Sequence, residues 1–303
     1  MGCRGETPAV PLPHRKEAAV YSRVYVEITN ICNRNCSFCP GTVRPLRRMS
    51  LSEFDTVTNR LQGVTEYLYY HVMGEPLTHP DLPAFIRIAT AKGFKSAITT
   101  NGTLLPARGQ ELIDAGVYKV NISVHSFEDG DDGESHGKYL DGILDFADEA
   151  SRSGVLTVLR LWNLDGHGEA LGGNNDRTLD YLRARFPDGG DTPWKFSPRG
   201  ARMRDKLHLE YGDRFEWPDQ AAEDRGNAVF CYGLKDHFAI LCDGRVVPCC
   251  LDREGGITLG NVFDTPVEEI LTSPRAEAMR AGFQRRCATE ELCRRCGYAQ
   301  RFG

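Results

Sequence analysis

The 303-residue sequence lacks a surplus of basic residues, a long hydrophobic run and an apolar leader. Its 42 Asp and Glu residues outnumber its 37 Lys and Arg residues, for a formal net charge of -5, so the composition gives no support to a nucleic-acid partner. No apolar stretch approaches the length of a membrane-spanning helix, and the opening residues contain no hydrophobic signal segment. We therefore expect a soluble, cytoplasmic and monomeric protein with no membrane partner.

Cysteine, by contrast, is abundant and unevenly distributed. The chain has eleven cysteines, of which three lie between Cys32 and Cys39 and seven lie between Cys231 and the C-terminus. In a reducing compartment such clusters favour metal ligation or catalysis over disulfides, and an odd total excludes complete pairing within one chain. The sequence therefore predicts two metal-binding regions, one near each end.

Strand-like and helix-like segments alternate six times along the first two thirds of the chain. The predicted strands are 23–29, 66–72, 95–100, 118–124, 155–161 and 192–197, and the predicted helices are 51–62, 81–93, 107–116, 140–154 and 176–186. This alternation predicts an α/β fold with a parallel sheet, and we expect a partial (β/α)6 barrel because the motifs of this region follow predicted strands. The expected divisions are an N-terminal arm (1–20), the barrel (21–197), a linker (198–230) and a metal-binding module (231–303).

The segment CNRNCSFCP places Cys32, Cys36 and Cys39 directly after the first predicted strand. Three thiolates at Cx3Cx2C spacing can bind three irons of a [4Fe–4S] cluster from one short loop and leave the fourth iron open. The alternative is a structural zinc ion, but zinc normally takes four protein ligands, and no fourth cysteine or histidine is nearby in the sequence.

This cysteine spacing resembles that of the radical S-adenosylmethionine (radical SAM) superfamily, in which the open iron binds the cofactor. MGEP (73–76) resembles the GGEP motif of that superfamily, with Met73 in place of the first glycine. The resemblance implies a partial barrel of the radical SAM type, reductive cleavage of the cofactor to methionine and a 5′-deoxyadenosyl radical, and an electron donor such as flavodoxin or ferredoxin. The cofactor-binding residues that it implies are Phe38, Gly74, Glu75, Pro76, Thr100, Asn101 and Ser123.

The C-terminal region resembles a shortened SPASM domain, called a twitch, which binds one auxiliary [4Fe–4S] cluster. The segment DGRVVPCC (243–250) and the terminal LCRRC (292–296) carry this resemblance. It implies ligation by Cys231, Cys293, Cys296 and one cysteine of the pair Cys249–Cys250. Zinc is the alternative for four thiols, and the surplus Cys242 and Cys287 are interpreted as buried thiols.

The doublet PCC (248–250) carries the most specific functional signal. Adjacent residues in extended backbone point to opposite sides, so one thiol can bind the cluster while its neighbour faces the active site and gives a hydrogen atom to a carbon radical. The whole layout resembles the radical SAM epimerases of aminoglycoside antibiotic biosynthesis, which implies inversion of C-5‴ of neomycin C to give neomycin B. In that resemblance Cys249 is the donor and Cys250 the ligand, whereas the Gx4C spacing favours Cys249 as the ligand.

Two other functions remain open at this stage. A dehydrogenase that oxidises an aminocyclitol or aminoglycoside alcohol would pass an electron to the auxiliary cluster and would need no donor thiol. A peptide-modifying maturase often carries an N-terminal recognition domain, for which the 20-residue arm is too short. The acidic segment EDGDDGE (128–134) suits a cationic aminoglycoside substrate, although such a segment is also typical of a solvated loop.

Overall fold

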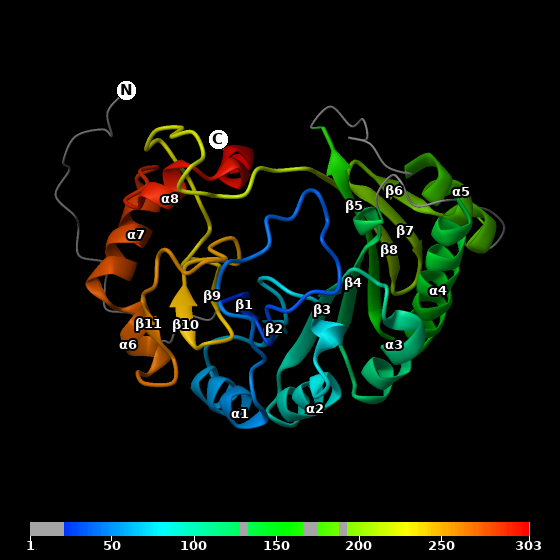
Figure 1. The fold of residues 1–303 in the computed structure, drawn as a ribbon, viewed down its shortest axis with the longest axis horizontal. Coiled ribbons are helices and arrows are strands. Elements are labelled where there is room, and N and C mark those ends of the chain that lie inside the picture. Colours follow the sequence, from blue (N-terminus) through cyan, green and yellow to red (C-terminus); the bar gives the residue numbers. More distant parts are fainter. Residues whose placement is uncertain (1–20, 128–132, 166–174, 188–192, 303) are drawn as a thin grey trace.

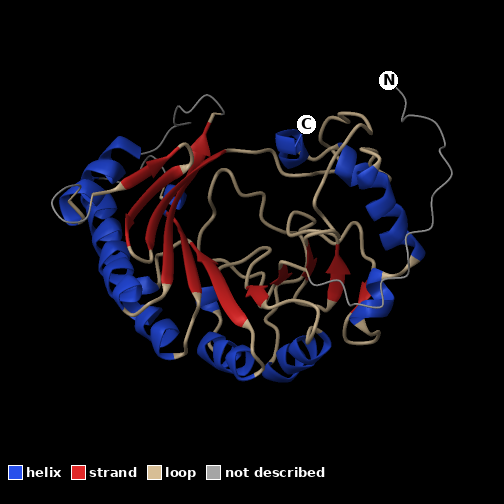
Figure 2. Cartoon of the chain, turned by 180° about the vertical axis from the view of Figure 1, so that it is seen from behind, coloured by secondary structure: helices blue, strands red, loops and turns tan. Residues whose placement is uncertain are grey.

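A single curved sheet forms the framework of the molecule. The computed structural model describes residues 21–127, 133–165, 175–187 and 193–302. Its eleven strands follow the order β11-β10-β9-β1-β2-β3-β4-β5-β8-β7-β6. Helices α1 to α5 lie along the convex side of this sheet, and the long loop after β1 lies inside the curve (Figure 1). The same arrangement seen from behind shows loops filling the concave side (Figure 2).

Six neighbouring parallel strands confirm the partial barrel. They are β1 (Arg23–Val26), β2 (Tyr67–Tyr69), β3 (Lys95–Thr100), β4 (Lys119–Ser123), β5 (Leu156–Leu164) and β8 (Leu207–Asp213). The connecting helices are α1 (Leu51–Arg60), α2 (Leu82–Ala91), α3 (Leu105–Asp114), α4 (Gly133–Arg152) and α5 (Asn175–Arg185). Short 3-10 turns η1 (Pro76–Thr78) and η2 (Val124–Ser126) follow β2 and β4. All the carboxyl ends of these strands therefore meet at one edge of the sheet.

The prediction of the sixth parallel strand at 192–197 was wrong. Its described part is β6 (Lys195–Ser197), which pairs antiparallel with β7 (Gly200–Arg204) at the sheet edge. The parallel neighbour of β5 is instead β8, which lies in the segment that we predicted as a linker. The β7–β8 hairpin buries alternate apolar residues (Ala201, Met203, Leu207 and Leu209), a period-two signal that the intervening Arg and Asp residues hid.

The C-terminal region continues the barrel sheet on its other side. Strand β9 (His237–Ile240) pairs parallel with β1, and β10 (Arg245–Val247) and β11 (Gly260–Asn261) follow as antiparallel strands. Helices α6 (Val267–Leu271), α7 (Pro274–Gln284) and α8 (Glu291–Arg294) and the turn η3 (Gly297–Phe302) cover this end. Because β1 pairs with both β2 and β9, it is the strand that joins the two cysteine-bearing regions.

Side-chain alternation along the strands separates the helix side from the concave side. In β1, Val24 and Val26 are fully buried in the main core, whereas Tyr25 belongs to a second, smaller cluster with Val72 and Ala239. Helix α1 begins with a capping box of Ser50 and Glu53, and both of its hydrogen bonds are present. Within the described residues, no helix has the length and apolar character that a membrane span requires.

Candidate cofactor and cluster sites

The loop after β1 carries all three cysteines of the first motif. Cys32 is exposed, and Cys36 and Cys39 are half-buried. The backbone N–H of Cys39 donates to the Cys36 carbonyl over 3.0 Å, and the N–H of Arg34 donates to the Cys32 sulfur over 3.4 Å. Three thiols held on one tight loop, with a backbone donor on sulfur, fit a [4Fe–4S] cluster with three protein ligands.

The segment MGEP lies directly against this loop. Gly74 has a φ of +78°, and a Cβ placed there would lie 2.9 Å from the Cα and carbonyl carbon of Asn30. The next residue, Glu75, donates its N–H to the Ile31 carbonyl over 2.9 Å. Only a glycine allows this approach of the two backbones, so the cofactor motif and the cysteine loop form one packed unit.

Glu75 is a buried carboxylate on the same motif. Its two oxygens accept from the backbone N–H groups of Leu77 (3.0 Å) and Asn101 (2.7 Å), which follow β2 and β3. Burial raises the pKa of Glu75 to about 7, although these two donors favour the charged form. The carboxylate thereby ties together the first turns after two neighbouring strands, and Pro76 begins η1 beside it.

The loops after β3 and β4 complete this edge of the sheet. Asn101 donates from its side chain to Asn33, in the cysteine loop, over 2.9 Å. Ser123 ends β4, and the ring of Phe38 lies 5.2 Å from the ring of His125, two residues further on. Thr100 ends β3 and is buried. All seven cofactor-binding residues that the radical SAM resemblance implies therefore lie on the loops that follow β1 to β4, or at the ends of these strands.

Tyr139 is a neighbour of this region that sequence reasoning missed. It comes from α4, and its hydroxyl donates to the Asn101 carbonyl over 2.6 Å. The Ser126 hydroxyl donates to the same carbonyl over 3.3 Å. No local pattern marks Tyr139, because the contact spans 38 residues and depends on how α4 packs on the sheet.

Four cysteines of the C-terminal region line one cavity. They are Cys231, Cys249, Cys293 and Cys296, and their neighbours in the lining are largely apolar, among them Val229, Ile257 and Phe283. Burial raises the pKa of each of the four thiols, as expected for an apolar site. Four thiols that line one apolar cavity are a suitable donor set for a cluster with four protein ligands, and Cys249 rather than Cys250 is among them.

The two thiols of the doublet have different surroundings. The strand β10 ends at Val247, so the doublet lies in a bend and not in extended backbone as we expected. Cys250 packs on the small concave-side cluster that also contacts Tyr25, Trp217 and Cys39 of the first motif. This geometry favours the Gx4C register, with Cys249 at the cluster position, over the register that the epimerase resemblance implies.

Comparisons with known proteins identify a domain around each of the two cysteine-bearing regions. The model of the radical SAM superfamily matches residues 26–170, and that of the SPASM iron–sulfur cluster-binding domain matches residues 231–297. The chain therefore carries a radical SAM domain followed by a SPASM domain. Its radical SAM domain binds S-adenosylmethionine and a [4Fe–4S] cluster, and its SPASM domain binds further iron–sulfur clusters. This decides against zinc, which was the alternative for the C-terminal thiols.

The curated relatives match only part of the chain. The GTP 3′,8-cyclase of Tolumonas auensis is 35% identical over 109 residues, covering 34% of this chain and 32% of that protein. The GTP 3′,8-cyclase of Alkaliphilus oremlandii is 31% identical over 173 residues, covering 53% and 52%. The AdoMet-dependent heme synthase of Methanosarcina barkeri is 31% identical over 117 residues, covering 37% and 32%. The chain thus spans about half or less of the length of these relatives.

Solved structures share the fold over nearly the whole chain. The crystal structure of BtrN in complex with AdoMet and 2-DOIA has a TM-score of 0.57 at 17% identity, covering 91% of this chain and 93% of that one. The structure of anSMEcpe with bound AdoMet has a TM-score of 0.58 at 12% identity, covering 91% and 88%. At these identities the likeness supports the fold alone.

Proposed function

We propose that this chain is an epimerase that inverts one carbon of an aminoglycoside and consumes S-adenosylmethionine as co-substrate. The carbon that the sequence resemblance indicates is C-5‴ of neomycin C, which would give neomycin B. The observation that carries the proposal is the Cys249–Cys250 doublet, whose two thiols lie in different surroundings. Cys249 lines the cavity of the other three C-terminal cysteines, and Cys250 packs on the concave side against Tyr25.

An epimerase needs two hydrogen-transfer groups. If one group both removed the hydrogen from one face of the carbon and returned a hydrogen to that face, the starting configuration would be restored. A second donor on the other face is therefore required, and a thiol suits this role because its weak S–H bond gives a hydrogen atom to a carbon radical. The thiyl radical left on sulfur would then take one electron from the external electron donor and one proton from solvent, which restores the thiol. The bound cofactor supplies the 5′-deoxyadenosyl group that removes the first hydrogen, and the doublet supplies the second donor next to an electron-carrying cluster.

The doublet allows two divisions of these roles. The epimerase resemblance assigns donation to Cys249 and ligation to Cys250. The opposite division is supported by the cavity that Cys249 lines together with Cys231, Cys293 and Cys296. Both divisions require one donor and one ligand, so the proposal for the function is the same in each, and a pair of variants separates them.

The concave face also offers polar partners for a substrate with many hydroxyl and amino groups. The indole N–H of Trp162 donates to Glu210 over 3.1 Å, and Arg160 lies 3.7 Å from the same carboxylate. Among the described residues, the buried atoms His71 Nδ1 and Arg160 Nε have no hydrogen-bond partner. Buried polar atoms of this kind are costly unless a ligand or water bonds them. The acidic segment 128–134, which we expected to receive ammonium groups, lies outside the residues whose side chains are described.

The decisive experiment is an anaerobic reaction with neomycin C, S-adenosylmethionine and reduced flavodoxin in deuterium oxide. We expect a product of unchanged connectivity that carries one solvent deuterium at the inverted carbon, detected by mass spectrometry and NMR. Cys249→Ala and Cys250→Ala are then compared for iron content, 5′-deoxyadenosine and product. The variant that keeps about eight irons and forms 5′-deoxyadenosine without epimer identifies the donor. Normal epimerisation by both variants would remove the basis of the proposal.

The second candidate is a dehydrogenase acting on an aminocyclitol or aminoglycoside alcohol. The four-thiol cavity favours it, since a fully ligated auxiliary cluster can accept an electron from a substrate radical. Product mass separates the two functions, because oxidation removes two hydrogens and epimerisation in ordinary water removes none. A cyclisation like that named for the partial relatives would instead change the connectivity of the product, which the same NMR spectrum would show.

A further inference from the structure

A buried carboxylate at the end of β1 collects four hydrogen-bond donors. The side chain of Glu27 has no exposed surface. Its Oε1 accepts from Arg44 Nη2 (2.6 Å) and from the N–H of Met73 (3.1 Å). Its Oε2 accepts from Arg44 Nη1 (2.8 Å) and from the N–H of Cys242 (3.0 Å). These four donors fill the lone-pair sites of one carboxylate.

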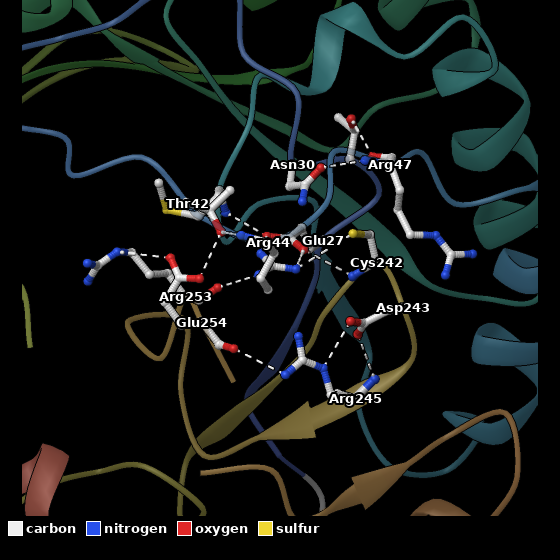
Figure 3. Close-up of polar contacts among 12 residues, drawn as sticks. Glu27, Asn30, Thr42, Arg44, Arg47, Cys242, Asp243, Arg245, Arg253 and Glu254 are labelled. Atoms are coloured by element: carbon white, nitrogen blue, oxygen red, sulfur yellow. Dashed lines mark hydrogen bonds and ion pairs between the residues drawn. The ribbon is translucent and has the colours of Figure 1, made fainter. Parts of the chain in front are cut away.

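Arg44 carries the network into the C-terminal module. It comes five residues after Cys39 in the cysteine loop, and its side chain is 6% exposed. Its Nε donates to the carbonyl of Arg253 over 2.6 Å, and its Nη1 lies 3.7 Å from the sulfur of Cys242. Figure 3 shows these side chains converging from the loop, from β1 and from the segments beside β10.

A second set of contacts lies beside the first. The hydroxyl of Thr42 and the N–H of Val43 donate to the two carboxylate oxygens of Glu254, over 3.2 and 3.3 Å. The carbonyl of Glu254 in turn accepts from Arg245 of β10 over 3.1 Å. The cysteine loop is therefore held against residues 253–254, which follow the Cys249–Cys250 doublet by only a few positions (Figure 3).

The chemistry of this network indicates positioning more than stability. Replacing a buried ion pair by apolar side chains of similar volume is often neutral or stabilising, so such a pair is weak evidence for a purely structural role. A forked, bidentate arginine–carboxylate pair does fix direction and spacing, which apolar packing does not. Here the pair fixes the relative positions of three segments. They are the cysteine loop, the first residue of MGEP, and the turn between β9 and β10 of the auxiliary-cluster module.

We propose that Glu27 and Arg44 are positioning residues that hold the MGEP loop and the auxiliary-cluster module in register with the cysteine loop and thereby set the affinity for S-adenosylmethionine. Glu27 acts through the N–H of Met73, which is followed directly by Gly74 and Glu75 of the cofactor motif. Arg44 acts through Arg253 and Cys242 of the module. The inference depends on the radical SAM and SPASM domains and not on which substrate the enzyme uses.

Two substitutions perturb the network to different degrees. Glu27→Gln keeps the shape of the side chain but replaces one acceptor oxygen by an NH2 group, which is a donor and faces the donors that the oxygen accepted from. Arg44→Lys keeps the charge beside Glu27 but loses the second arm of the fork and the bond to the Arg253 carbonyl. If Glu27→Gln does not fold, Arg44→Lys alone decides the question. Arg47→Met is the matched control, because Arg47 lies on the same loop and pairs with Glu53 at the surface.

The measurements use the reconstituted holoenzyme without any sugar. Amide hydrogen exchange at Met73 and Cys242 should become at least about tenfold faster in Glu27→Gln and Arg44→Lys, with the sheet core unchanged. The KM for S-adenosylmethionine in dithionite-driven cofactor cleavage should rise about tenfold while iron stays at about eight per chain. The control should match the unmodified enzyme in both measurements.

The result that would overturn the proposal is a KM for S-adenosylmethionine within about twofold of the control in a folded, iron-replete variant. A lowered unfolding temperature with unchanged KM and unchanged exchange at the two amides would assign the network to stability alone. Because no sugar is present, neither result depends on the epimerase proposal, and failure of the epimerase assay leaves this test intact.

Discussion

Gly74→Ala should weaken cofactor binding through a backbone contact and not through a lost side chain. Gly74 has a φ of +78°, and an added Cβ would lie 2.9 Å from backbone atoms of Asn30 and closer still to the Thr29 carbonyl oxygen. Carbon atoms of this kind do not approach below 3.0 Å, and backbone atoms cannot rotate away as side chains can. The cysteine loop or the MGEP loop must therefore move.

Gly63 provides the matched control for this substitution. Its φ is +76°, but a Cβ there would meet no atom within 4 Å. A left-handed backbone costs a residue with a Cβ about 1–2 kcal/mol, and Gly63→Ala should cost only this amount. Gly74→Ala should add about 1–3 kcal/mol for the steric conflict. For a protein of this size each kcal/mol lowers the Tm by about 2 °C.

The assay compares the two variants with the unmodified enzyme under anaerobic conditions. Equilibrium dialysis should show at least about tenfold weaker binding of S-adenosylmethionine to Gly74→Ala, because displacements of about 1 Å at a reacting site cost about that much or more. Gly63→Ala should bind the cofactor normally with a slightly lower Tm. Equal Tm values and equal affinities for the two variants would refute the reasoning from the close contact.

Three further predictions concern the cluster ligands and the buried carboxylate. Cys36→Ala, like alanine at either other cysteine of the first motif, should abolish cofactor cleavage, and a normal yield of 5′-deoxyadenosine would refute the assignment. Cys231→Ala should lower the iron from about eight to about four per chain, whereas Cys242→Ala should keep about eight, because Cys242 faces the Glu27 network and not the four-thiol cavity. Burial raises the pKa of Glu75 to about 7, so the protonated form is favoured in the folded state, and the stability present at pH 4.5 should decline as the pH rises to about 7. Urea denaturation of the enzyme without S-adenosylmethionine should show this decline, worth at most about 3 kcal/mol, and Glu75→Gln should lack it.

The sequence was most informative where the chemistry is local. The three cysteines of the first motif and the pair Gly74 and Glu75 each form a pattern of residues a few positions apart, and in the structure they lie on the adjacent loops after β1 and β2. The parallel order of β1 to β5 also follows from alternation alone. The position of β8 did not, because β8 belongs to a hairpin rich in Arg and Asp, and each strand of that hairpin carries only two buried apolar residues in alternation.

Contacts between distant segments were beyond such patterns. Glu27 and Cys242 are 215 positions apart, and nothing in either local sequence marks them as partners. The doublet shows a related limit. The Gx4C spacing favoured Cys249 as the cluster ligand, whereas the epimerase resemblance favoured Cys250, and both interpretations assumed extended backbone. The chain instead bends after Val247, and Cys249 lines the four-thiol cavity.

Strand β1 brings the two cysteine-bearing regions next to each other. It pairs parallel with β2 on one side and with β9 on the other, so the cysteine loop, the MGEP loop and the C-terminal module all start from three adjacent strands. Side chains on β1, and on the residue directly after it, contact both of these neighbouring regions. Tyr25 contacts the concave-side cluster that includes Cys250 and Cys39, and Glu27 bonds the loops on either side. A shift of β9 by one residue against β1 would reverse which side chains face the concave side, and it would separate Glu27 from the Cys242 N–H. The register Val26↔Ile240 therefore fixes how the turn between β9 and β10 lies against the loops that follow β1 and β2.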